Sequence, residues 1–426
     1  MSTYKQLTGG VAAPLGFTAG GIYCGVKRAG YPTNTVTAAS IVANEPLQAE
    51  HKPDLAMIVS EVPCTAAAVF TQNLVQGAPI AVCRENLAKG KIRAVTANSG
   101  NANTCNADGV EKARAMCKLT AEALGISADE VLVASTGVIG QILPIEPLEA
   151  GIPAVAKRLK KDGTAAARAI MTTDTVVKQA ALSFELDGKT ITLGAMSKGS
   201  GMIHPNMATM LAFVTTDAAI STEMLDKALR EAVGDSFNML SVDGDTSTND
   251  TLCILASGLA GNEEITAAGE GYDLFAGALR SICMTLARMM AKDGEGATKL
   301  VECVVTGAQD TAAAKTAAKS VICSPLLKSA MFGCDANWGR ILCALGYSGA
   351  PMNVNAIDVA FRSAAGYIRV CEMGSGIPFS EEDAKRILSE DEILIEVTLR
   401  DGEGKAAAFG CDLTYDYVKI NGDYRT

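Results

Sequence analysis

The stretch KGSGMIHPNMATMLAFVTTD, residues 198–217, decides how this sequence is interpreted. A glycine-rich turn leads to Ala208 and Thr209, and a strand-like apolar run follows at once. If the Ala208–Thr209 peptide bond is cleaved, Thr209 becomes an N-terminus with a hydroxyl and a free α-amine on one residue. A hydroxyl needs a nearby base to act as a nucleophile, and an α-amine, with a usual pKa of about 7.7–8.0, is such a base. The stretch therefore predicts a self-cleaving chain with a threonine nucleophile.

The composition is that of an ordinary globular protein. The 426 residues are enough for two or three domains, with 48% hydrophobic and 20% charged residues. The net charge of -10 argues against nucleic acid or an anionic membrane as a partner. Residues 1–20 lack a charged segment followed by a long apolar run, so we expect no signal peptide and a cytoplasmic location. The most apolar helical segment, 274–290, carries Arg280 and Arg288, which argues against a membrane span.

The cysteines and histidines exclude several kinds of site. The 13 cysteines are an odd number and show no zinc-ribbon or thioredoxin spacing, so we expect reduced thiols. With only two histidines, a His-rich zinc site is impossible, and a Ser-His-Asp or Cys-His site would need one of them. His51 is interpreted as a solvated turn residue. His204 precedes Pro205 and lies five residues before Thr209, so it is a candidate for shaping the turn, and an acid–base role stays open.

Hydrophobic patterning predicts irregularly alternating strands and helices, which support only an α/β or α+β class. Asp187-Gly188 is a hairpin signal between a strand at 180–186 and a return strand that ends near Lys198. A final hairpin is expected from strands at 393–399 and 406–414, with DGEG at 401–404 as its turn. Other strands are expected at 54–62, 91–100 and 128–140, and helices at 110–125, 153–171, 221–233, 270–291 and 380–390.

Three further groups of residues are candidates by residue type. Thr136 and Gly137 follow a strand, so a hydroxyl and a glycine backbone N–H are available there, although a simple turn fits as well. Glu295 lies between two glycines in the first DGEG, where backbone can approach a ligand closely. Aspartates in two loops match no metal-ligand spacing and are interpreted as loop caps: Asp174, Asp243, Asp245 and Asp250. We expect no metal.

Six motifs in series resemble the ornithine acetyltransferase family, the glutamate N-acetyltransferases of arginine biosynthesis. Each motif alone is weak, but together they span essentially the whole chain in order. They are NSGNANTC (98–105), STGVIG (135–140), KGSGMIHPNMATML (198–211), DGEGATK (293–299), GCDANWGRI (333–341) and YVKINGDYRT (417–426).

The resemblance implies a processing step and a fold. Family members cut themselves before the threonine of the ATML motif, which here would give an α chain of 1–208 and a β chain of 209–426, assembled as α₂β₂. The implied fold is α+β, the N-terminal-nucleophile sandwich of the aminopeptidase-esterase type, with β layers flanked by helices. Smaller α/β domains are then expected in the β chain, at about 220–305 and 306–426.

The resemblance also implies an activity. Thr209 would take the acetyl group of N-acetylornithine as an ester and pass it to glutamate in a ping-pong reaction, without a cofactor. Acetyl-CoA is a possible second donor, and no sequence feature decides this. Thr136 and Gly137 would stabilise the oxyanion. The implied substrate-binding residues are Thr175, Lys198, Thr209, Glu295, Asn421 and Thr426, and the last two require the tail to fold back into the site.

Two alternatives stay open at this point. An aminopeptidase or amidase of the same fold would use the same Thr209 but let water resolve the ester. A non-enzymatic amino-acid sensor would keep the fold and stay a single chain of about 44 kDa.

Overall fold

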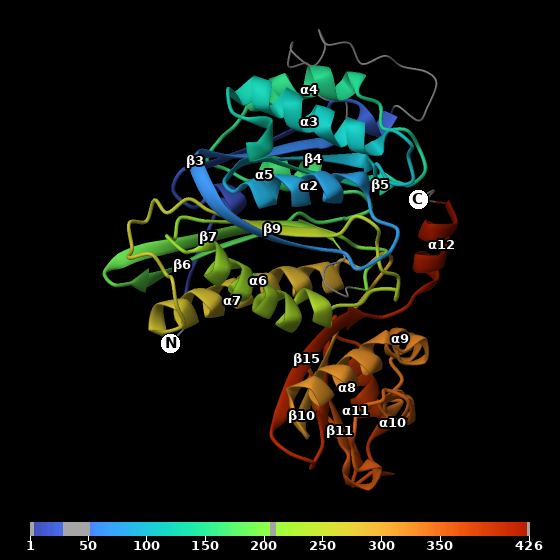
Figure 1. The fold of residues 1–426 in the computed structure, drawn as a ribbon. Coiled ribbons are helices and arrows are strands. Elements are labelled where there is room, and N and C mark those ends of the chain that lie inside the picture. Colours follow the sequence, from blue (N-terminus) through green and yellow to red (C-terminus); the bar gives the residue numbers. More distant parts are fainter. Residues whose placement is uncertain (1–3, 29–51, 205–209, 424–426) are drawn as a thin grey trace.

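The computed structural model describes residues 4–28, 52–204 and 210–423. Within these ranges the strands form two mixed sheets with helices packed on them, so the predicted α+β class is confirmed (Figure 1). The nine-stranded sheet contains β1 (Lys5–Leu7), β2 (Phe17–Ile22), β3 (Leu55–Phe70), β4 (Ile92–Asn101), β5 (Val131–Val138), β6 (Lys178–Leu186), β7 (Lys189–Lys198), β8 (Leu211–Thr216) and β9 (Thr251–Ala256).

The long strand β3 connects two halves of this sheet. Its first part, from Leu55, pairs with β2 and β4, and its second part, Thr65 to Phe70, pairs with β9. β4 and β5 are parallel on one side, while β6, β7, β8 and β9 continue on the other. The predicted strand at 54–62 therefore continues to Phe70 and joins both halves.

The strand that follows Thr209 is buried on both faces. Leu211 and Phe213 of β8 pack into the core beneath β2–β5, whereas Ala212 and Val214 point to the opposite core. Successive side chains of a strand alternate between the two faces of a sheet, so an unbroken apolar run fits a strand covered on both sides. β8 is thus held rigidly between β7 and β9, in register Lys198–Leu211 and Leu211–Thr251.

In Figure 1, α3 and α4 lie above the strands of the first sheet, and α6 and α7 lie below them. Ser221 caps the helix that starts at Thr222, since its side chain accepts from the Met224 N–H. Gly125 ends the predicted helix 110–125 in the left-handed conformation, as expected of a C-terminal glycine. The predicted helix 153–171 is wrong as one element, because residues 157–163 separate two helices. The helices of this part are α2 (Ala78–Lys89), α3 (Gly109–Leu124), α4 (Glu146–Ala156), α5 (Thr164–Ala169), α6 (Thr222–Asp235) and α7 (Glu270–Lys292).

The second sheet has six strands and lies below the first in Figure 1. Its first strand starts at Leu300, and α6, β9 and α7, which precede it in the chain, pack with the first sheet. The expected domain boundary near 305 stays a prediction. Its strands are β10 (Leu300–Ala308), β11 (Asp358–Ser363), β12 (Gly366–Glu372), β13 (Ser375–Gly376), β14 (Glu392–Thr398) and β15 (Gly404–Cys411), and its helices are α8 (Thr311–Cys323), α9 (Pro325–Phe332), α10 (Trp338–Gly346) and α11 (Glu381–Leu388).

The predicted final hairpin is wrong. β14 and β15 are strands at nearly the expected positions, but they do not pair with each other, because β10 lies between them. β14 is parallel to β10 and β15 is antiparallel to it. The DGEG segment crosses the end of β10, where the N–H groups of Asp401 and Gly402 donate to the Gly307 carbonyl. Gly307 has φ +74°, and a Cβ there would lie 2.0 Å from the Leu399 carbonyl oxygen, so the crossing requires glycine.

Two further features bear on location and on the tail. α7 is long and apolar enough to cross a membrane, but half of its apolar segment is buried, and it packs on β6 and α6 as a core helix. All thirteen cysteines are described and free.

After β15 the chain forms α12 (Tyr415–Asp423), which runs back beside the first sheet (Figure 1).

Candidate active site

A cavity of about 340 Å³ opens where the strand ends of the first sheet meet the loop after α7 and the tail helix α12. Five of the predicted site residues line it: Thr136, Gly137, Lys198, Glu295 and Asn421. Met210 and Leu211, at the head of β8, also line it. The predicted nucleophile Thr209, its neighbour Ala208 and the terminal Thr426 lie outside the described residues. Concave sites with a few convergent polar groups are the usual form of small-molecule sites.

Thr136 and Gly137 lie near the end of strand β5, and Gly137 adopts a backbone conformation that favours glycine. β5 runs parallel to β4, and Gly137 lies opposite Gly100. Gly137 has φ +131°, and a Cβ there would lie 2.3 Å from the Gly100 carbonyl carbon. The backbone at the rim of the cavity is therefore fixed by two close-packed glycines.

A layer of buried asparagines supports this strand end. Asn98 on β4 accepts a hydrogen bond from the Ser135 hydroxyl at 2.6 Å, and its own amide donates to the Asn101 carbonyl at 2.9 Å. From the opposite side, the Asn249 amide donates to the Ser135 carbonyl at 3.0 Å. Ser135 is thus held through its side chain and its backbone, which fixes the neighbouring Thr136.

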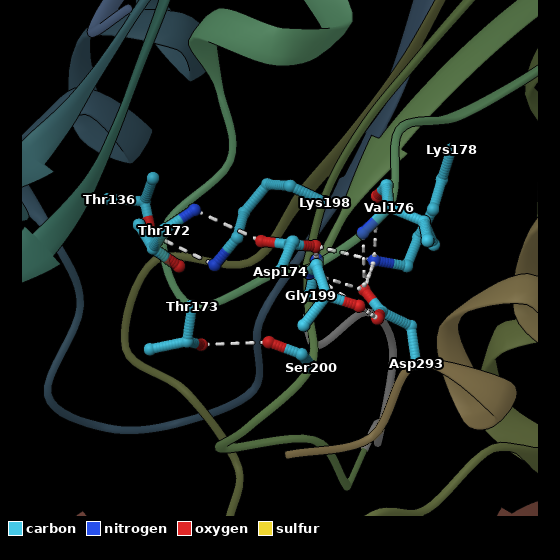
Figure 2. Close-up of polar contacts among 11 residues, drawn as sticks. Thr136, Thr172, Thr173, Asp174, Val176, Lys178, Lys198, Gly199, Ser200 and Asp293 are labelled. Atoms are coloured by element: carbon cyan, nitrogen blue, oxygen red, sulfur yellow. Dashed lines mark hydrogen bonds and ion pairs between the residues drawn. The ribbon is translucent and has the colours of Figure 1, made fainter. Parts of the chain in front are cut away.

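Lys198 brings a buried cationic side chain to the cavity. Lys198 is only 8% exposed, and its Nζ donates to the Thr136 hydroxyl oxygen at 3.4 Å (Figure 2). Burial lowers the pKa of Lys198 below its usual value, although the Asp174 carboxylate opposes the shift. Because the Thr136 oxygen accepts from Lys198, the hydroxyl hydrogen of Thr136 is free to donate to a second group.

Glu295 and Asn421 form the other wall. The Glu295 N–H donates to the Ser200 carbonyl at 2.8 Å, so its backbone is tied to the loop after β7. A Cβ on Gly201 would lie 2.2 Å from the Glu295 carboxyl carbon, which means that the Glu295 side chain crosses directly over this glycine. Asn421 on α12 donates to Glu295 Oε2 at 2.7 Å. The tail helix therefore does reach the cavity.

Thr175 differs from the other predicted residues. It is exposed, its hydroxyl and N–H both donate to the Asp293 carboxylate, and it lines a neighbouring cavity together with Asp293. Thr172 and Thr173 from the same loop line the main cavity instead. The structure therefore places Thr175 next to the site rather than at its surface.

His204 and the aspartates of the second loop have structural partners. His204 Nδ1 lies 3.1 Å from the Ser241 hydroxyl, and burial lowers the pKa of His204 to about 4. Asp243 accepts the N–H groups of Met202 and Ile203. Among the described residues, no group of three or more metal-ligating side chains is arranged to hold a metal ion.

Sequence reasoning missed the residues that support the site. The asparagines of NSGNANTC carried no assigned role, although asparagine is rare inside strands, and such a run within β4 is a signal that could have been read. Asp174 was interpreted as a loop cap, and Lys178 and Asp293 were not singled out. These three side chains form a buried ion-paired group beside Lys198 (Figure 2).

Comparisons with known proteins identify the family of the chain. Residues 38–426 match the ArgJ family. The arginine biosynthesis bifunctional protein ArgJ of Symbiobacterium thermophilum is 50% identical over 424 residues, which are 99% of this chain and 100% of that protein. A crystal structure of ornithine acetyltransferase from Mycobacterium tuberculosis, complexed with ornithine, is 38% identical and covers 48% of this chain and 100% of its own, with a TM-score of 0.40.

A more distant likeness is to an aminopeptidase of Ochrobactrum anthropi, described as a variant of the Ntn-hydrolase fold. It is 11% identical, covers 68% of this chain and 88% of its own, and has a TM-score of 0.38. The family match and the full-length relative carry the assignment: the chain belongs to the ArgJ family and is an enzyme of arginine biosynthesis.

Proposed function

We propose that this enzyme moves the acetyl group of N-acetylornithine to glutamate through an ester on Thr209, after it has cleaved itself between Ala208 and Thr209. The observation that carries the proposal is the cavity that gathers Thr136, Lys198 and Glu295 around Met210, the residue that follows Thr209 in the chain. Membership of a family of bifunctional transferases decides against the amidase and sensor alternatives.

Self-cleavage uses the threonine hydroxyl. The Thr209 oxygen attacks the Ala208 carbonyl carbon, the peptide C–N bond breaks as its nitrogen takes a proton, and Ala208 is left as an ester on Thr209. Water hydrolyses this ester, which frees the Ala208 carboxylate and the Thr209 hydroxyl. The reaction leaves Thr209 with the α-amine that acts as its base in the second reaction.

Acetyl transfer then has two halves. The α-amine takes the hydroxyl proton of Thr209 as its oxygen attacks the acetyl carbonyl, and the same proton goes to the ornithine nitrogen as the amide bond breaks. Glutamate, with its amine neutral, attacks the carbonyl carbon of the acetyl ester. The bond between the acetyl carbon and the Thr209 oxygen breaks, the α-amine of Thr209 passes a proton from the glutamate nitrogen to that oxygen, and N-acetylglutamate leaves. Each tetrahedral oxyanion accepts hydrogen bonds from the Thr136 hydroxyl and the Gly137 N–H, and the Lys198–Thr136 contact, which leaves that hydroxyl hydrogen free, supports this role.

The charges of the cavity match the α-carboxylate that both substrates carry and the side-chain ammonium of N-acetylornithine. Lys198 is the partner of the substrate α-carboxylate, and Glu295 is the partner of the ornithine side-chain ammonium. Asn421 holds the Glu295 carboxylate from the tail, as their 2.7 Å hydrogen bond supports. Thr175 and Thr426 complete the substrate-binding set that the family resemblance implies.

Three finer points belong to the same proposal. Acetyl-CoA serves as a second acetyl donor, in line with the bifunctional name of the Symbiobacterium relative. The two chains, 1–208 and 209–426, assemble as α₂β₂. The enzyme acts in the cytoplasm and on small amino-acid substrates.

Thr209→Ala tests the proposal most directly. Without the hydroxyl, the chain stays a single 44.0 kDa species on a denaturing gel and forms no N-acetylglutamate from N-acetylornithine and glutamate. Thr209→Ser is the matched control, because it keeps a hydroxyl and so retains cleavage. Intact mass and the N-terminal sequence of the second fragment locate the cut. In the wild type this fragment must begin TMLAF. Cleavage of Thr209→Ala at this bond contradicts the proposal.

A further inference from the structure

A lysine with no exposed side-chain surface lies between two buried aspartates next to the cavity. Lys178 Nζ donates to Asp174 Oδ1 at 2.7 Å and also to Asp293 Oδ2. The Asp174 side chain is likewise fully buried, and that of Asp293 is 5% exposed. A buried ion pair is costly to desolvate and adds little stability over apolar packing, so its presence calls for another role.

The two aspartates hold the backbone on both sides of the cavity. Asp174 accepts the Gly199 N–H at 2.7 Å, and Gly199 directly follows Lys198. Asp293 lies two residues before Glu295 and accepts the Thr175 N–H at 3.1 Å. Lys178 therefore links, through its two carboxylate partners, the residue next to Lys198 and the segment that carries Glu295.

The same group sets the charge around Lys198. Figure 2 shows Lys198 and Lys178 on opposite sides of the Asp174 carboxylate, so Asp174 is shared between two cations. Burial alone would raise the pKa of Asp174, but Lys198 and Lys178 lower it to about 2, and Asp174 therefore stays ionised. The charged groups that face Lys198 are Asp174, Lys178, Asp250 and Glu295, with Lys27 from the 3₁₀ helix Val26–Arg28 on a further side.

We propose that Asp174, Lys178 and Asp293 form a positioning triad that fixes the Lys198 ammonium and the Glu295 carboxylate at the spacing of one amino-acid substrate. None of the three residues lines the main cavity, so the triad acts through Lys198 and Glu295. The inference rests on the proposed binding of the substrate carboxylate by Lys198.

The triad predicts two pH shifts of opposite sign. An activity that needs the Lys198 ammonium falls as pH rises through the pKa of Lys198. This fall is the alkaline limb of the profile of activity against pH. Asp174→Asn removes the carboxylate that favours the ammonium, so this alkaline limb moves to lower pH. Lys178→Met removes a neighbouring cation, so the limb moves to higher pH. A shift of about one unit in each direction is the expected size for a charge at this range.

The test measures kcat/KM for N-acetylornithine against pH in the matured full-length enzyme, since this ratio reports the free enzyme. A displacement of about 1 Å in the site lowers kcat/KM by about 10²-fold. We expect Lys178→Met to lower kcat/KM by this amount, mainly by raising KM. Lys328→Met is the matched control, because Lys328 is also buried but donates to the Cys411 carbonyl in the second sheet. Its alkaline limb is expected to stay in place.

Three comparisons are decisive. Opposite shifts in Asp174→Asn and Lys178→Met support the triad, whereas unmoved limbs in both overturn it. If Lys178→Met does not fold, Asp293→Asn replaces it: a limb shifted to lower pH, by less than in Asp174→Asn, supports the triad, and no shift overturns it. Lys198→Arg separates failure of the triad from failure of the proposed function. Arginine stays charged, so the alkaline limb must vanish in this variant. An alkaline limb that persists in Lys198→Arg contradicts the role of Lys198 itself.

Discussion

The two sheets of this protein differ in where their charged side chains lie and in what they hold. Around the nine-stranded sheet, Lys178, Asp174 and Lys198 are buried, and Asp174 accepts the Gly199 N–H beside the cavity. The six-stranded sheet also buries Lys328, but the Arg362–Glu396 pair that joins two of its strands is half exposed. Exposed pairs contribute little to stability, whereas buried ones constrain geometry. Under the proposed function, catalysis belongs to the first sheet and the tail, and we infer that the second sheet serves as a frame.

The largest expected effect comes from Thr136→Val, which removes a hydroxyl at the rim of the cavity and keeps the shape of the side chain. Loss of one oxyanion donor lowers kcat by about 10²–10³-fold. Thr306→Val, on β10 of the second sheet, is the matched control and should leave kcat unchanged. Steady-state kinetics with N-acetylornithine and glutamate measure both. Equal effects of the two variants would remove the distinction between the sheets.

Local patterns could be predicted from the sequence where the partner strand is adjacent in the chain. Asp187 and Gly188 have φ values of +52° and +73°, as a tight hairpin turn requires, and the β6–β7 hairpin forms as expected. The final hairpin failed for a different reason. Alternation reveals that β14 and β15 are strands, but it carries no information about which strand each one pairs with, and β10 enters between them from about ninety residues upstream.

The residues of the site also divide into those that the sequence reveals and those that it does not. Thr136, Lys198 and Glu295 were found because family motifs surround them, and the cavity brings them together. The group of Asp174, Lys178 and Asp293 could not be found, since Asp293 lies 115 residues after Lys178 and meets it only in the folded chain. Buried charge is a property of the folded neighbourhood, and residue type alone does not reveal it.

Asn421→Ala should have a smaller effect than Thr136→Val, and it tests whether the tail belongs to the site or to the frame. It removes the hydrogen bond to Glu295 Oε2, and a bond to a charged group contributes about 1.5–3 kcal/mol. We expect KM for N-acetylornithine to rise by about tenfold or more. Val418→Ala, an exposed position on the same helix, is the control. An unchanged KM in Asn421→Ala would make α12 part of the frame.

His204→Gln should change how stability depends on pH. Burial lowers the pKa of His204 from 6.5 to about 4, so the folded protein favours the neutral ring. As pH falls below 6.5 the unfolded chain binds a proton that the folded chain does not, and stability is lost until pH reaches about 4. The variant should therefore lose less unfolding free energy than the wild type between pH 7 and pH 5. Urea unfolding at both values measures this, with His51→Gln as the control.

Arg362→Ala should have the smallest effect and bears most directly on the second sheet. The Arg362–Glu396 pair joins β11 to β14 at 2.6 Å, but its side chains are 50% and 32% exposed, so solvent screens the attraction. We expect the free energy of unfolding to be nearly unchanged, because solvent screens an exposed pair, and self-cleavage and kcat to be unchanged. A kinetic effect as large as that of Asn421→Ala would mean that this sheet transmits geometry to the cavity. The view of it as a passive frame would then fail, because an exposed pair on a distant strand can reach the cavity only through the packing of β10 and β15 against the loop that carries Glu295.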